Sequence, residues 1–95
     1  MDKLTLQIVL VLQKYGFTKA ALVGSYARGD FSESSDIDLI VEPPKKMSLL
    51  GLVRVQRELE ELLGKDVDLL TYNGLHPYVR HYILSNELIL DGSVK

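Results

Sequence analysis

Residues 24–41 read GSYARGDFSESSDIDLIV, and this stretch decides both the fold and the chemistry that we expect. A Gly24-Ser25 turn stands ten residues ahead of Asp36-Ile37-Asp38, which opens an apolar run. Side chains alternate along a strand and each residue rises about 3.3 Å, so Asp36 and Asp38 share one face with their Cα atoms about 6.6 Å apart. Ile37, Leu39 and Val41 then alternate onto the core face. Carboxylates at this spacing can bind a hard cation, Mg²⁺ or Mn²⁺. The stretch therefore predicts a metal site on a strand.

The turn before this strand is suited to binding phosphate. Gly24 permits a positive φ and a close approach of the backbone, and Ser25 can offer both its hydroxyl and its backbone N–H to an anion. Arg28 is expected either to steady phosphate charge or to form a structural salt bridge to the aspartate strand. A phosphate site beside metal-binding carboxylates indicates chemistry on a nucleoside triphosphate.

Two aspartates in a strand are weak evidence when taken alone. Asp36 and Asp38 could instead cap a turn or pair with Arg28. A third carboxylate, Asp68, repeats the pattern in a later apolar run and would join the cluster if the two strands are neighbours. It could then serve as a metal ligand or as a general base for an attacking hydroxyl. We favour Asp68 as this third carboxylate. The alternatives are Asp66, on the same strand face, and a merely solvated strand residue at position 68.

Outward from residues 24–41, apolar periodicity and turn residues predict the other elements. Long helices are expected over 3–15 and 48–63, the second with a core face of Leu52, Val55, Leu59, Leu62 and Leu63. Strands are expected over 19–23, 36–42 and 66–72, with a short edge strand over 87–90. A short helix is expected over 25–29 and a last helix over 77–86. This order predicts an α+β fold, filling residues 1–95 as one domain, in which helices pack on a mixed sheet of three to four strands.

Composition excludes several kinds of site. The net charge is −2 and no basic cluster is longer than Lys45-Lys46, which argues against strong nucleic-acid binding. Cysteine is absent, so disulfides and thiolate zinc sites are excluded. No apolar run approaches the ~20 residues that span a bilayer, and no signal peptide is evident. We expect a cytoplasmic protein that does not bind membranes.

The motif formed by Gly24, Ser25, Asp36 and Asp38 resembles the signature of the polymerase-beta-like nucleotidyltransferases. Residues 24–39 are similar to the small prokaryotic branch called minimal nucleotidyltransferases, and the resemblance covers nearly the whole chain. It implies the nucleotidyltransferase palm fold. It also implies that Asp36 and Asp38 bind two Mg²⁺ ions, that Asp68 is the third carboxylate, and that Gly24 and Ser25 hold the triphosphate of ATP.

The resemblance also implies a partner. Members are often encoded beside a helical HEPN-domain toxin, an RNase, and act as its antitoxin, in some cases by transferring AMP from ATP to a toxin tyrosine. We expect a partner or a second copy to supply part of the acceptor site, which makes a hetero-oligomer or a homo-oligomer possible. Two other functions stay open: a non-catalytic module that neutralises its partner by occlusion, and a small-molecule nucleotidyltransferase.

Overall fold

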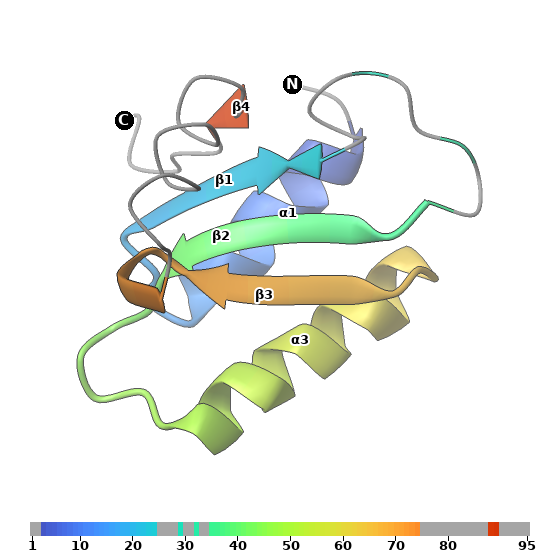
Figure 1. The fold of residues 1–95 in the computed structure, drawn as a ribbon. Coiled ribbons are helices and arrows are strands. Elements are labelled where there is room, and N and C mark those ends of the chain that lie inside the picture. Colours follow the sequence, from blue (N-terminus) through green and yellow to red (C-terminus); the bar gives the residue numbers. More distant parts are fainter. Residues whose placement is uncertain (1–2, 25–28, 30–31, 33–34, 75–87, 90–95) are drawn as a thin grey trace.

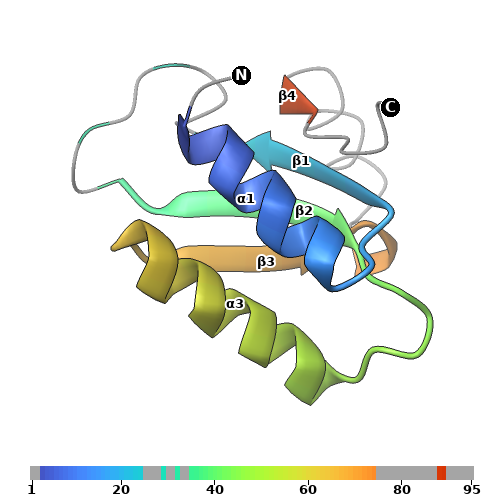
Figure 2. The same cartoon turned by 180° about the vertical axis from the view of Figure 1, so that it is seen from behind.

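The computed structural model describes residues 3–24, 29, 32, 35–74 and 88–89. Two helices lie side by side on one face of a sheet, as Figures 1 and 2 show from opposite sides. The described elements are α1 (Lys3–Lys14), β1 (Lys19–Val23), β2 (Ile37–Glu42), α3 (Leu49–Leu63), β3 (Val67–Thr71), a 3₁₀ turn η1 (Tyr72–Gly74) and β4 (Leu88–Ile89). The predicted α+β fold with helices packed on a small sheet is confirmed.

The sheet has the strand order β3-β2-β1-β4 and is mixed, as predicted. β1 runs antiparallel to both β2 and β4, whereas β2 and β3 are parallel. A parallel pair needs a long crossover connection, and α3 makes that crossover (Figure 1). This connection brings residues of β3 beside residues of β2 that lie about thirty positions earlier.

The core lies between the sheet and the two helices. Ile37, Leu39 and Val41 of β2 are fully buried there, which confirms their predicted alternation toward the core. α3 contributes Val55 and Leu59, both fully buried. A cluster of this kind is the main stabilising element of a domain this size, because burying each large aliphatic side chain contributes about 1.5–3 kcal/mol.

One predicted core position of α3 is wrong. Leu62 is 47% exposed, whereas Leu63 packs against the core. Successive helical residues point about 100° apart, and in the last turn of α3 it is Leu63 that points toward the core.

Side-chain and glycine caps mark the ends of α3. The Ser48 Oγ accepts a hydrogen bond from the Gly51 backbone N–H at 3.1 Å, which satisfies a donor left unpaired by the first turn. At the other end Gly64 has φ +69° and its N–H donates to the Glu60 carbonyl at 2.9 Å. The left-handed conformation explains why a glycine ends this helix.

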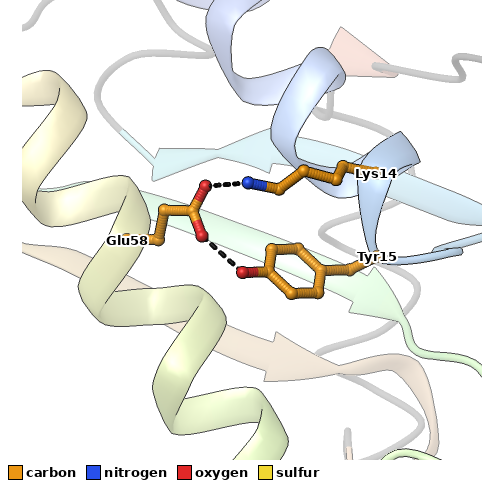
Figure 3. A network of polar contacts seen from close by, with 3 residues as sticks. All are labelled: Lys14, Tyr15 and Glu58. Atoms are coloured by element: carbon orange, nitrogen blue, oxygen red, sulfur yellow. Dashed lines mark hydrogen bonds and ion pairs between the residues drawn. The ribbon is translucent and has the colours of Figure 1, made fainter.

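A polar cluster ties α1 to α3 on the helical side of the molecule (Figure 3). Glu58 of α3 accepts hydrogen bonds from the Lys14 ammonium and the Tyr15 hydroxyl. Both hydrogen bonds lower the pKa of Glu58, and the same contacts raise the pKa values of Lys14 and Tyr15. The cluster therefore favours the ionised carboxylate, the protonated ammonium and the neutral phenol.

Element boundaries differ by about one residue from those predicted. For example, β2 and β3 begin at the paired residues Ile37 and Val67, one residue later than predicted. The predicted edge strand over 87–90 is present as the two residues of β4. The predicted helices over 25–29 and 77–86 lie outside the described residues, Gly29 excepted. In the described part of the chain, no helix has both the length and the apolar character needed to cross a membrane.

Candidate active site

Asp36 and Asp38 lie at the start of β2. Asp36 directly precedes the strand and is exposed, while Asp38 is its second residue and half-buried. Because Ile37 and Leu39 point into the core, the alternation of a strand directs Asp38 to the opposite face of the sheet. The structure thus places Asp38 on the face that the helices leave uncovered.

The parallel pairing of β2 and β3 brings Asp68 level with Asp38. Residues opposite each other in a sheet point to the same side. Asp68 is exposed, and its charge acts on the neighbouring carboxyl of Asp38. Asp66 instead precedes β3, and its backbone carbonyl accepts from the Ile37 N–H at 2.9 Å. Of the two aspartates that the sequence offered, Asp68 is the one in register with Asp38.

The environment of Asp38 disfavours its charged form. Burial raises the pKa of the Asp38 carboxyl, and the neighbouring carboxyl of Asp68 and the charge of Asp36 raise it further. Clustered carboxylates repel one another in this way unless a cation lies between them. Asp36 and Asp68 therefore both act electrostatically on Asp38.

Gly24 adjoins this cluster from β1. It follows Val23, the register partner of Asp38, and has φ +74°, a conformation that glycine adopts without strain. A Cβ atom at Gly24 would lie only 2.6 Å from the Asp38 Oδ2. The absent side chain is thus what allows the backbone after β1 to approach the carboxylate. Ser25 and Arg28, the other predicted phosphate-binding residues, lie outside the described residues.

The face that carries Asp38 is partly apolar, which the sequence analysis missed. Ala21, Val23, Ile40 and Tyr72 form a second buried cluster, and the pairings Val23–Asp38 and Ala21–Ile40 place the first three on the side of Asp38. Strict alternation predicted an outward position for Ile40. The continuous apolar run from Leu39 to Val41 was the signal that both faces of β2 are covered. Apolar neighbours of this kind explain why burial is the largest cause of the raised pKa of Asp38.

The chemistry of the donor set fits a divalent metal. All three aspartates offer only carboxylate oxygens, the ligands that Mg²⁺ prefers, and Mg²⁺ commonly takes one or two carboxylates with water and substrate phosphates as its other ligands. Among the residues that the structure describes, no three histidine, cysteine, aspartate or glutamate side chains converge as a complete metal-binding group. The Asp38–Asp68 pair is thus the unit that the fold itself assembles.

Comparison with known proteins agrees with this geometry. The profile of the family described as Nucleotidyltransferase domain matches residues 6–90. MJ0435 of Methanocaldococcus jannaschii, whose name describes a candidate protein adenylyltransferase, is 47% identical over 85 residues, covering 90% of this chain and 91% of that protein. A solved structure described as a minimal nucleotidyltransferase superposes with a TM-score of 0.79 at 32% identity, covering 88% of this chain and 86% of that one.

A more distant structure shares the fold. It is the MNT antitoxin of Shewanella oneidensis in complex with a tri-AMPylated HEPN toxin, with a TM-score of 0.72 at 19% identity, covering 92% of this chain and 68% of that one. The family match spans nearly the whole chain, and the MJ0435 relative aligns over most of both lengths. The chain therefore belongs to the nucleotidyltransferase domain family and is a nucleotidyltransferase of the minimal type.

Proposed function

We propose that this protein transfers AMP from ATP to a tyrosine hydroxyl of a HEPN-domain toxin and thereby acts as its antitoxin. The observation that carries the proposal is the Asp38–Asp68 carboxylate pair beside Gly24, in a chain of the nucleotidyltransferase family. The sequence identity with MJ0435, a relative whose name describes a protein adenylyltransferase, supports a protein acceptor. The fold shared with an antitoxin bound to an AMPylated HEPN toxin supports this class of partner.

Each predicted site residue has a role in this reaction. Asp36, Asp38 and Asp68 would hold Mg²⁺, with two ions expected and Mn²⁺ as the alternative. When bound, the metal supplies positive charge that neutralises the phosphates and the clustered carboxylates. Gly24 permits the backbone to approach the triphosphate, and Ser25 and Arg28 are proposed to bind its oxygens.

The chemical step is an in-line substitution at the α-phosphorus of ATP. The acceptor oxygen forms a bond to this phosphorus as the bond to the bridging oxygen of pyrophosphate breaks, so the products are an AMP ester and pyrophosphate. Asp68 is exposed at the edge of the acidic cluster and is proposed to accept the proton of the attacking hydroxyl, as a general base. Most of the rate enhancement would come from positioning and electrostatic stabilisation.

The test is the intact mass of a HEPN toxin from the same genome after incubation with this protein, ATP and Mg²⁺. We expect the toxin to gain one or more AMP groups, with peptide mapping placing them on tyrosine. Asp38→Asn should abolish the gain, whereas the matched variant Asp66→Asn should retain it. A gain that maps to serine or threonine would contradict the tyrosine assignment while keeping the enzyme class.

The same experiment separates the alternative functions. A stable complex that silences the toxin without any mass change, and equally well with Asp38→Asn, would indicate neutralisation by occlusion. The absence of both complex and modification would contradict the proposed partner and favour a small-molecule acceptor. Circular dichroism of each variant checks that the fold is retained.

A further inference from the structure

The outer face of α3 carries apolar and charged side chains together. Leu50 is 79% exposed and Val53 is 37% exposed, and Arg54, Arg57 and Glu61 are exposed beside them. These five residues, which we call the α3 outer face, line one open groove with Tyr15 and Glu58. Among the described residues, Arg54, Arg57 and Glu61 form no ion pair, whereas the neighbouring Glu58 pairs with Lys14.

The charges along α3 run against the helix dipole. The basic residues Arg54 and Arg57 precede the acidic residues Glu58, Glu60 and Glu61, which lie toward its C-terminus. The first turn has no acidic residue and the last turn no basic one. Acidic residues stabilise the N-terminal end of a helix and basic residues its C-terminal end. This order is unfavourable for a helix alone and is complementary to an antiparallel copy of the same helix.

We propose that the α3 outer face docks against the same face of a second copy of this chain, with the two helices antiparallel. A two-fold axis beside residues 57 and 58 brings Arg54 of each copy level with Glu61 of the other. An interface with this symmetry repeats every contact twice, so the contact between Arg54 and Glu61 forms twice.

Charge complementarity favours a second copy over other occupants. A partner with a surface of one sign would complement either the basic half or the acidic half of α3, and would face like charge at the other. A second copy complements both halves at once, and like charges opposed across an interface are strongly unfavourable. The surface lies on the helical side of the sheet, opposite the face of Asp38, so docking leaves the acidic cluster accessible (Figures 1 and 2).

Two single charge reversals test the register. In a dimer of Arg54→Glu, acidic residues at positions 54 and 61 oppose each other, and in a dimer of Glu61→Arg, basic residues do. Each variant should therefore dimerise at least about tenfold more weakly than the unmodified chain. An equimolar mixture of the two variants restores both opposite-charge pairs in a heterodimer. Sedimentation equilibrium of the full chain, a 10.7 kDa monomer, measures the association, with Lys3→Glu on α1 as the matched control.

We expect the unmodified chain and Lys3→Glu to dimerise equally, each reversal alone to weaken the dimer, and the mixture to regain it. A chain that stays monomeric at every concentration overturns the proposal, as does a dimer that both reversals leave unchanged. A mixture that does not recover the dimer overturns the antiparallel register. Reversals that weaken only the binding of a toxin would assign this face to that partner and equally overturn the proposal. Circular dichroism confirms that each variant is folded.

Discussion

Asp38 of β2 and Asp68 of β3 stand opposite each other in two parallel strands, and the charge of Asp68 raises the pKa of the Asp38 carboxyl. Their separation in the sequence is bridged by α3, which returns the chain to the same end of the sheet. The position of Asp68 therefore depends on how well α3 packs as well as on its own strand. Catalytic and structural variants can accordingly be separated by measuring activity and stability side by side.

The role of Asp68 can be tested against that of its neighbour Asp66. Asp68→Asn removes both a carboxylate beside Asp38 and the proposed base, so AMP transfer should fall by about a hundredfold to ten-thousandfold. Asp66→Asn keeps the backbone carbonyl that Ile37 uses and should retain most activity. Intact-mass time courses with the toxin measure both rates. Equal losses in the two variants would contradict the assignment of Asp68.

Gly24 can be compared with Gly29, since the two share a positive φ but differ in surroundings. Alanine at either position adopts a left-handed conformation at a cost of about 1–2 kcal/mol. At Gly24 the new Cβ would also meet the Asp38 Oδ2 at 2.6 Å, whereas at Gly29 nothing lies within 4 Å. We expect Gly24→Ala to lose activity, whereas Gly29→Ala should lose stability without losing activity. Urea unfolding and the mass assay report the two effects. A Gly24→Ala variant with normal activity would show that the close approach is dispensable.

The cluster of Glu58, Lys14 and Tyr15 predicts how stability changes with pH. The pKa of Glu58 is lowered in the folded state, so its contribution is present above its ordinary value of 4.5 and is lost as pH falls through the lowered pKa. The pKa values of Lys14 and Tyr15 are raised from 10.5 and 10.0. Their contributions are present below those ordinary values and are lost as pH rises through the raised ones.

Thermal melts of the unmodified chain and Glu58→Gln over a range of pH check this. The difference in Tm should be largest near neutral pH and vanish in acid, where the carboxyl of Glu58 is protonated. Added salt should reduce the difference, because the cluster is partly exposed. Glu61→Gln, on the same helix, should show a smaller difference at neutral pH. A Glu58→Gln variant with an unchanged Tm at every pH would show that the cluster does not stabilise the fold.

Burial of α3 predicts a large difference between two leucine truncations. Leu59 is fully buried, and Leu59→Ala should lower the free energy of unfolding by about 2–5 kcal/mol. Leu10 of α1 is 55% exposed, and Leu10→Ala should change the free energy by no more than about 0.5 kcal/mol. Urea titrations of both variants measure the two values. Similar losses would contradict the placement of the core between the helices and the sheet.

Local patterns predicted the elements of this fold well. The apolar stripes of α1 and α3 and the alternation of Ile37, Leu39 and Val41 indicated which faces are buried, because helix and strand periods are properties of consecutive residues. The errors lie where the environment comes from another part of the chain. Leu62 had the expected periodicity, but the last turn of α3 directs Leu63 to the core instead. Strand alternation places Ile40 on the face opposite the helices, where a solvated side chain would be expected, yet Ile40 is fully buried there in the second cluster.

The site shows the same division. The spacing of Asp36 and Asp38 and the glycine at position 24 are visible in the sequence, because a strand has only two faces and a positive φ favours glycine. The functional roles of Ser25 and Arg28 stay predictions. Only tertiary structure placed Gly24 against Asp38 and chose Asp68 over Asp66 as the neighbour of Asp38. Strand order and register depend on how β1, β2, β3 and α3 pack together, and that packing is set by contacts between residues far apart in the chain.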